Sequence, residues 1–280
     1  MASQHDESSP LQPEPYDHVF APMETEMLAW LALPADAKVL DAGCGPGVMA
    51  ARFAAALGPA GQVDALDQNP ETLARAGQYL AAQPGRARVR VHAGDLLQLP
   101  FDDASFDLAW ASFVLHHISD PVAAARELRR VVRPGGRVVV RETGVPLRML
   151  PFDLGIGEPG LQDRLRVAHN RWFTTIRYAE PVATPYPWGW TQVLRDAGCQ
   201  QVTARTFWLE LLPPLSAVQG QYLLDSLQRH LDKPELRALL DPADVATVAQ
   251  LTDPASPHYL LARPDLHVLA GLSLYVGTVG

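Results

Sequence analysis

The chain has 280 residues, of which 48% are hydrophobic and 19% are charged. This length suits one α/β domain with insertions, and the composition supports a sizeable core and excludes wholesale disorder. A formal net charge of −8 argues against a nucleic-acid partner, because such proteins usually present a basic face. Cys44 and Cys199 stand far apart without metal-ligand spacing, so the sequence predicts neither a disulfide framework nor a metal site.

Residues 1–15 are rich in serine, proline and acidic residues, and we expect them to form a flexible tail. They lack the apolar core of a secretory signal. No uncharged apolar run in the chain reaches the roughly 18 residues that a membrane span requires. We therefore expect a cytoplasmic protein with no membrane partner, in which residues 16–280 form a single domain.

Residues 16–33 have the apolar periodicity of a helix, and from Lys38 short apolar strands alternate with helices. Asn69 and Asp120, each followed by proline, are typical helix N-caps. This alternation predicts a parallel sheet layered by helices. The first five strands are expected at residues 38–43, 61–67, 87–95, 106–112 and 137–142, with helices at about 48–57, 69–83 and from 121 onward.

The regular alternation breaks after Glu142, and two long insertions follow at about 143–187 and 213–263. Between them we expect a short helix at 190–197 and a sixth strand at 200–211, and after them a seventh strand at 265–277. Both insertions follow parallel strands, so they should form a helical lid over the carboxyl edge of the sheet. Six aromatic residues in and next to the first insertion either line an acceptor pocket or pack the lid: Trp172, Phe173, Tyr178, Tyr186, Trp188 and Trp190. Phe152 is a further aromatic residue of this insertion.

The stretch "VLDAGCGPG" places Gly43, Gly45 and Gly47 between the first strand and the following helix. Glycines let the backbone approach a ligand closely, and the free N–H groups of a helix start can bind polar atoms. A dinucleotide fingerprint would need its third glycine at Val48, so that template fails. Taken alone, the stretch also fits a tight connection between a strand and a helix that binds no ligand.

Two acidic residues stand at the ends of neighbouring strands. Asp67 ends the second strand, where a carboxylate can accept hydrogen bonds from both hydroxyls of a ribose. Asp95 follows the third strand and could accept from an adenine amino group, while the Leu96 N–H donates to a ring nitrogen. Each acid alone also fits a surface or turn position, but together with the glycine stretch they predict a nucleoside site.

Four stretches in sequence order carry a family resemblance: "VLDAGCGPG", "ALDQNPETLARA", "AGDLLQLPFDDASFDLAWASFVLHHI" and "ELRRVVRPGGRVVVRE". Together they resemble the successive motifs of class I S-adenosylmethionine-dependent methyltransferases. The similarity is closest to the branch of the ubiquinone/menaquinone-biosynthesis and small-molecule enzymes. It covers residues 39–142, about a third of the chain. It implies a Rossmann-like, doubly wound sheet of seven mostly parallel strands, with helices on both faces and helical lid insertions.

The resemblance implies S-adenosyl-L-methionine as the cofactor. The glycines would wrap its methionine moiety, and Asp41 would orient that loop or reach the amino group. Gln68 would lie against the adenine, Ser112 would meet the methionine part, and Tyr16 would close over the cofactor. Pro46 replaces the Thr or Ser often found in the loop. The implied cofactor-binding residues are Tyr16, Asp41, Gly43, Gly45, Gly47, Asp67, Gln68, Asp95, Leu96 and Ser112.

The implied reaction is methyl transfer to a small, largely apolar or aromatic acceptor, at oxygen or carbon. His116 and His117 follow the fourth strand and are the candidates for a catalytic base, although helix-start packing also explains them. Glu142 should face the same crevice as an acceptor contact. Two alternatives stay open: an enzyme of the same fold that catalyses a non-methylating cyclisation or rearrangement, and a nucleoside-binding protein without catalysis.

Overall fold

A computed structural model describes residues 15–177 and 186–280 and contains a seven-stranded sheet of order β3-β2-β1-β4-β5-β7-β6. Every neighbouring pair from β3 to β5 is parallel, and β7 runs antiparallel to both β5 and β6. The predicted mostly parallel sheet of seven strands is confirmed. The strands are β1 Lys38–Ala42, β2 Gln62–Asp67, β3 Arg88–Ala93, β4 Phe106–Ser112, β5 Val132–Arg148, β6 Gln200–Leu211 and β7 Val268–Thr278.

The helices begin where the sequence provides caps. The Asn69 side chain accepts from the backbone N–H groups of Glu71 and Thr72, and the Asp120 side chain accepts from that of Ala123. Four helices accompany the first five strands: α1 Pro15–Leu31, α2 Val48–Ala56, α3 Pro70–Ala82 and α4 Pro121–Val131. The remaining helices are α5 Leu161–Arg177, α6 Trp190–Asp196, α7 Ala217–Asp232, α8 Pro234–Arg237 and α9 Pro242–Thr252, with 3-10 turns at η1 Leu115–His117 and η2 Leu260–Ala262.

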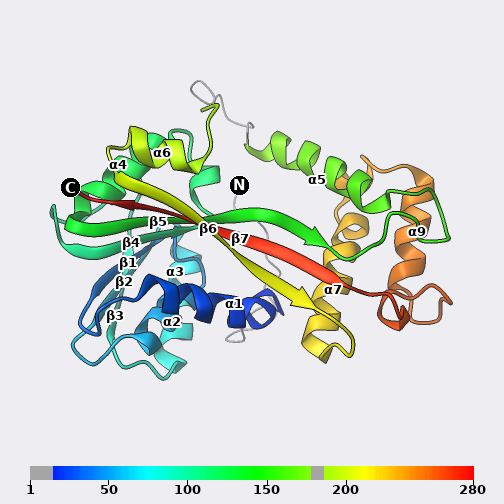
Figure 1. The fold of residues 1–280 in the computed structure, drawn as a ribbon, viewed down its shortest axis with the longest axis horizontal. Helices are drawn as coiled ribbons and strands as arrows, with labels where there is room; N and C mark the ends of the chain where they lie inside the picture. The colour runs from blue at the N-terminus through cyan, green and yellow to red at the C-terminus, as the bar shows by residue number, and fades with distance from the viewer. Residues whose placement is uncertain (1–14, 178–185) are drawn as a thin grey trace.

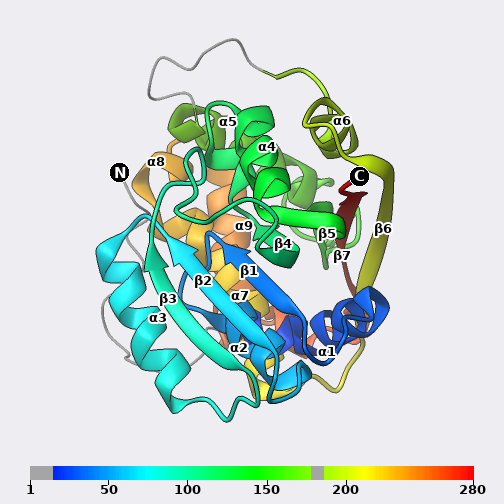
Figure 2. The ribbon, with the colours of Figure 1, turned by 90° about the vertical axis from the view of Figure 1, so that its left-hand side faces the viewer.

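Alternate side chains of the central strands enter two hydrophobic clusters, one on each face of the sheet. Val39 and Trp110 belong to the cluster that includes α1 and α2, whereas Leu40 and Ala111 belong to the cluster that includes α4 and α6. Figure 2 shows α1 and α3 on one side of the strands and α4 and α6 on the other. Both faces are therefore covered, which is the doubly wound arrangement that the sequence predicts.

The fifth strand is longer than predicted. It was expected to end at Glu142, but β5 continues to Arg148, so residues 143–148 belong to the sheet rather than to a lid. The reason is the antiparallel partner: Thr143 pairs with Leu272 and Arg148 pairs with Leu269. Figure 1 shows β5, β6 and β7 extending together toward α5, α7 and α9. A partner strand more than a hundred residues away supplies these hydrogen bonds, and local periodicity cannot reveal it.

The described part of the rest of both insertions contains the helices α5, α7, α8 and α9, which lie beyond the carboxyl ends of β5 and β6 (Figure 1). Arg164 of α5 donates two hydrogen bonds to buried Asp244 of α9, at 2.8 and 2.7 Å, so the two insertions are tied together. Leu165 of α5 and Leu223 of α7 belong to the same hydrophobic cluster as Val39 of the sheet. The helices are therefore packed onto the sheet. Residues 1–14 of the expected tail lie outside the described residues.

Candidate cofactor and acceptor site

The carboxyl ends of β3, β2, β1, β4 and β5 lie side by side, and backbone hydrogen bonds join the loops that follow them. Gly43 N donates to Leu66 O at 2.7 Å, which fixes the loop after β1 to the end of β2. Gly94 N donates to Asp67 O at 3.1 Å, which joins the ends of β3 and β2. The predicted cofactor residues on these loops therefore share one edge of the sheet.

The three glycines of the loop have different reasons for lacking a side chain. All have positive φ, at 76°, 53° and 89° for Gly43, Gly45 and Gly47. A Cβ on Gly43 would lie 2.6 Å from Val114, and a Cβ on Gly47 would lie 3.1 Å from Leu80. A Cβ on Gly45 would have nothing within 4 Å. The protein's own packing thus explains two glycines, and Gly45 alone borders open space that a ligand can enter.

Asp67 holds this loop in place. Its Oδ2 accepts from Gly45 N at 3.1 Å and its Oδ1 accepts from Asn69 N at 3.0 Å, at the start of α3. A carboxylate has about four lone-pair sites, so two remain available to ribose hydroxyls. The side chain is partly exposed, and neighbouring Gln68 is exposed. Asp67 therefore supports the loop and still presents acceptors at the edge.

The segment after β3 forms a turn, which was the alternative interpretation of Asp95 from the sequence. Its Oδ1 accepts from Leu97 N at 2.9 Å, and its backbone carbonyl accepts from Gln98 N at 3.1 Å. Asp95 is exposed, whereas Leu96 is buried. The turn interpretation therefore holds, and the same turn places Asp95 and Leu96 next to the end of β2.

Asp41 is the clearest sign of a missing partner. It is 1% exposed, and its Oδ2 has no hydrogen-bond partner within residues 15–177 and 186–280. Burial raises the pKa of this carboxyl to about 7, while the positive charge of Arg141 and the Ala50 N–H oppose the rise. An unpaired buried polar atom is costly and calls for an explanation. The ammonium group of an amino-acid ligand would satisfy it, so the residues present fit the implied cofactor.

The sequence reasoning missed a charged group formed by the buried Glu24 and Arg141 and the partly exposed Arg52; we call it the Glu24 cluster. Arg141, 4% exposed, donates from Nη1 to Glu24 Oε1 at 2.5 Å and from Nε to Ser112 Oγ at 2.7 Å. Arg52 Nε lies 2.7 Å from Glu24 Oε2, although these two atoms are not aligned for a hydrogen bond. The available signal was a charged residue inside an apolar strand, in "VVVRE".

Four aromatic side chains cover this region: Tyr16 and Phe20 of α1, Phe113 after β4, and Tyr222 of α7. Tyr16 stacks on Phe20 with ring centroids 4.4 Å apart, and its centroid lies 6.3 Å from Phe113 and 6.1 Å from Tyr222. The Tyr16 hydroxyl is buried and has no partner in the described part of the chain. Phe113 has a φ of +53°, which is strained for an aromatic residue, and its N–H donates to Arg141 O at 3.0 Å.

The predicted catalytic histidines form a chain of contacts with Glu142. His116 Nδ1 lies 2.8 Å from Glu142 Oε2, and His116 Nε2 lies 2.9 Å from His117 Nε2. Glu142 is 5% exposed, and Phe173 of α5 has its ring 5.6 Å from His116 and 6.0 Å from His117. A carboxylate that holds one imidazole nitrogen fixes the tautomer of the ring. The arrangement is able to accept a proton at the end of β4.

Most of the aromatic residues considered for a pocket lining lie elsewhere. Trp188 is 65% exposed, and Phe152 of the same insertion is 73% exposed. Trp172 faces Lys233 at 4.5 Å within the lid, Tyr186 donates to Asp196, and Trp190 packs with α4 and α6. Among the described aromatics of that set, Phe173 is the one that contacts the histidine pair; Tyr178 lies outside the described residues.

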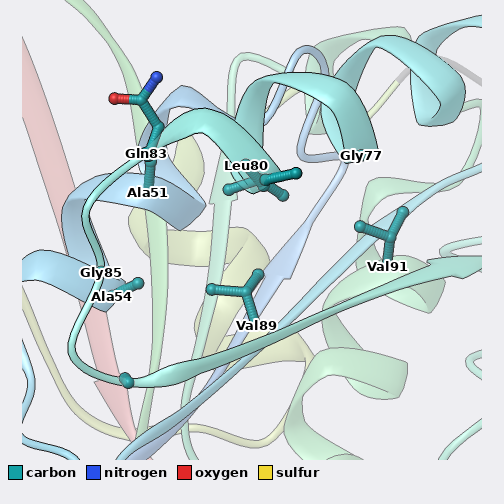
Figure 3. A pocket seen from close by; sticks show the side chains of 10 residues that line it. Ala51, Ala54, Gly77, Leu80, Gln83, Gly85, Val89 and Val91 are labelled. Atoms are coloured by element: carbon teal, nitrogen blue, oxygen red, sulfur yellow. The ribbon is translucent and has the colours of Figure 1, made fainter.

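A groove of about 330 Å³ opens at another place, between α2, α3 and the edge strand β3 (Figure 3). It is lined mainly by small and apolar residues, including Ala51, Ala54, Leu80, Val89 and Val91. It contains no charged side chain and none of the predicted site residues. Within residues 15–177 and 186–280, no three His, Cys, Asp or Glu residues are grouped so as to hold a metal ion.

Residues 40–140 match the family model described as "Methyltransferase domain". A segment of 110 residues is 36% identical to a demethylmenaquinone methyltransferase of Bacillus subtilis, covering 39% of this chain and 47% of that protein. A segment of 105 residues is 42% identical to an uncharacterized 37.1 kDa protein in transposon TN4556 of Streptomyces fradiae, covering 38% of this chain and 30% of that protein. The chain thus matches less than half the length of these relatives.

A solved structure has the same fold over nearly the whole chain. It is phosphoethanolamine N-methyltransferase 2 of Haemonchus contortus, in complex with phosphomonomethylethanolamine and S-adenosylhomocysteine. It is 15% identical, with a TM-score of 0.53, and the match covers 94% of this chain and 56% of that one.

None of the helices described here has the length and apolarity to cross a bilayer. The resemblance inferred from the four motifs is confirmed over residues 40–140, which match a methyltransferase domain, and the chain has the fold of S-adenosylmethionine-dependent methyltransferases.

Proposed function

We propose that this protein transfers the methyl group of S-adenosyl-L-methionine to a small, largely apolar or aromatic acceptor, at oxygen or carbon. One observation carries the proposal. The unpaired, buried carboxylate oxygen of Asp41 lies under a glycine loop whose Gly45 borders open space, and Asp67 stands at the next strand end. A ligand with an ammonium group, a flexible chain and a ribose matches these three features in order.

In this proposal Asp41 binds the amino group of the cofactor, and the loop from Gly43 to Gly47 wraps its methionine chain. Asp67 binds the ribose hydroxyls, and Gln68, Asp95 and Leu96 surround the adenine. Tyr16 and Ser112 border the methionine part. When bound, the cofactor supplies an electrophilic methyl group, so the protein mainly has to align the acceptor and exclude water.

The acceptor would lie between the aromatic residues and the histidine pair. A hydroxyl acceptor must lose its proton as its oxygen gains the methyl group, and His116, held by Glu142, is placed to take that proton together with His117. Phe173 of the lid contacts both rings and would shield them from water. The demethylmenaquinone methyltransferase relative is named for an aromatic, apolar acceptor, which supports an acceptor of this chemical class.

The proposal is tested by incubating the protein with S-adenosylmethionine and a panel of phenols, enols, thiols and amines. We expect S-adenosylhomocysteine to accumulate with apolar aromatic hydroxyl or carbon acceptors, and each product to gain one methyl group by mass spectrometry. A product of unchanged mass would indicate the cyclisation or rearrangement alternative. Cofactor binding without turnover of any acceptor would support a nucleoside-binding protein instead.

Cofactor affinity should depend on pH through Asp41. Its pKa is about 7 in the free protein, and a bound ammonium group favours the ionised carboxylate, so binding at lower pH must first release a proton. The affinity for S-adenosylhomocysteine should therefore fall by up to about tenfold for each pH unit below about 7, and level off above it. Calorimetry in buffers of different ionisation enthalpy measures both the affinity and the released proton.

Asp41→Asn is the control for this pH dependence. It keeps the size of the side chain and cannot titrate, so its affinity should be weaker at high pH and nearly constant from about pH 6 to about pH 8. An unchanged pH slope in this variant would show that another group titrates.

A further inference from the structure

Arg229 of the lid helix α7 is a cation without a partner in the described part of the chain. Its side chain is exposed, and its guanidinium makes no hydrogen bond or ion pair with any of the residues described. Two acidic residues lie within about one turn of it on the same helix, but both are engaged elsewhere. Asp225 accepts a hydrogen bond from Gln221 at 2.7 Å, and Asp232 accepts one from Gln228 at 3.1 Å. The guanidinium of Arg229 is therefore available to a ligand.

The position of Arg229 on α7 shows which side of the helix it occupies. Arg229 comes almost two full helical turns after Tyr222, so the two residues lie on the same side of α7. The Tyr222 ring contacts Tyr16 of α1, with centroids 6.1 Å apart. One turn beyond Arg229, Lys233 Nζ lies 4.5 Å from the ring centroid of Trp172 in α5. Arg229 thus lies between these two contacts, on the side of α7 that faces α1 and α5.

The same two neighbours of α7 lead to the histidine pair. Phe173, next to Trp172 in α5, contacts both histidine rings. Tyr16 of α1 contacts Phe113, which precedes the turn that carries the histidines, with ring centroids 6.3 Å apart. Of these side chains His117 is exposed and the others are half-buried. The side of α7 with Arg229 and the end of β4 therefore border one region, and the side chains at its border are accessible.

The charged groups that act on His169, between α5 and the end of α7, are all cationic. The ring centroid of His169 lies 6.5 Å from that of His230. Burial lowers the pKa of His169 to about 4, and the charges of Arg229, His230 and Lys233 lower it further. Burial also lowers the pKa of His230, so both rings are neutral near pH 7. Arg229 and Lys233 remain as fixed charges, and a bound anion would offset their repulsion.

We infer that Arg229 binds an anionic group of the acceptor, a carboxylate or a phosphate, at the end remote from the atom that receives the methyl group. The inference rests on the proposed function and names its substrate class more closely, as an aromatic or apolar molecule with a negative charge at one end. A guanidinium can bind two oxygens of such a group through parallel hydrogen bonds. Arg229 and the histidine pair would then hold the two ends of one molecule, which orients it toward the methyl group.

The inference is tested with aromatic acceptors that differ only in the charge of their remote end. The probes are hydroxyphenyl alkanoates of increasing chain length and their neutral primary amides, and matching phosphonates distinguish a phosphate site from a carboxylate site. Calorimetry measures their binding to the protein saturated with S-adenosylhomocysteine, and kcat/KM measures their turnover with S-adenosylmethionine. At the best-fitting chain length, the parent should favour the anion over the amide by about 10- to 100-fold, the effect of one charge-assisted contact.

Arg229→Gln removes the charge and keeps a polar side chain, so it should bind the anion and the amide within about threefold of each other. Arg229→Glu should reverse the preference and favour acceptors that end in an amine. Arg195→Gln is the matched control, because Arg195 is also exposed but lies on α6, which packs with α4. It should keep the parent's preference. Every variant should bind S-adenosylhomocysteine within about twofold of the parent, because the proposed cofactor contacts lie on other residues.

Three outcomes would overturn the inference. The first is a parent protein that binds no acid or phosphonate of the series more tightly than the neutral counterpart. The second is an Arg229→Gln variant with the full preference of the parent, and the third is an equal loss of preference in Arg229→Gln and Arg195→Gln, which would reflect net charge alone. If the parent still methylates neutral acceptors, the proposed function stands without the anion site. If it does not bind S-adenosylhomocysteine, the proposed function fails as well.

Discussion

A His116→Asn variant is expected to methylate a hydroxyl acceptor about 100- to 10,000-fold more slowly than the parent, which is the usual contribution of a positioned base. Its affinity for S-adenosylhomocysteine should stay within about twofold, because the proposed cofactor contacts lie on other residues. The loss of rate is expected because His116 contacts buried Glu142 on one side and His117 on the other. Single-turnover kinetics with an acceptor from the panel measures the effect on chemistry alone.

Glu142→Gln separates positioning from charge. The amide oxygen can still accept from His116 Nδ1, so the ring keeps its tautomer, but the negative charge that stabilises a protonated imidazole is lost. We expect a smaller loss of rate than for His116→Asn, and no change in the binding of the cofactor or the acceptor. His267→Asn is the matched control, because His267 and Glu210 form a similar pair at 2.8 Å that is exposed and lies on β6 and the approach to β7. If His116→Asn turns over within about threefold of the parent, the histidine pair does not act as the base.

The cofactor half of the site could be predicted because its signals are local. A strand end, a glycine turn and a capped helix lie within a dozen residues of each other, and the order of parallel strands then brings Asp41, Asp67 and Asp95 to one edge. The sequence also predicted that His116, His117 and Glu142 face one crevice, since the histidines follow the fourth strand and Glu142 ends the predicted fifth strand. The roles of these residues toward a ligand remain proposals.

The features that could not be predicted depend on contacts between distant parts of the chain. Glu24 and Arg141 are separated by 117 residues, and nothing in either local pattern names the other as its partner. The extension of β5 to Arg148 depends on β7, which arrives after both insertions. Residue 43 has to be glycine because a Cβ there would collide with Val114, which is its neighbour only in the folded chain. The aromatic content of the first insertion was visible, but which ring faces the site was not.

The Glu24 cluster should be the most sensitive point for stability in this half of the molecule. Glu24 is 1% exposed, and its two carboxylate oxygens face Arg141 and Arg52. Glu24→Gln keeps the size of the side chain but leaves the buried guanidinium of Arg141 without its ion-pair partner. Removal of one partner from a buried pair typically costs about 3–5 kcal/mol, because the remaining charge stays buried. We expect a decrease of that size in the free energy of unfolding, measured by urea denaturation.

Glu26→Gln on the same helix is the matched control. Glu26 pairs with Arg205 at 3.0 Å, but the two side chains are 56% and 44% exposed, so the pair should contribute at most about 1 kcal/mol. Because Glu24 also fixes α1 and with it Tyr16 next to Arg141, Glu24→Gln should weaken binding of S-adenosylhomocysteine, and Glu26→Gln should not. Equal, small changes in stability for both variants would mean that water or a rearranged side chain compensates the buried charge of Arg141, and that α1 is held to the sheet by its apolar face alone.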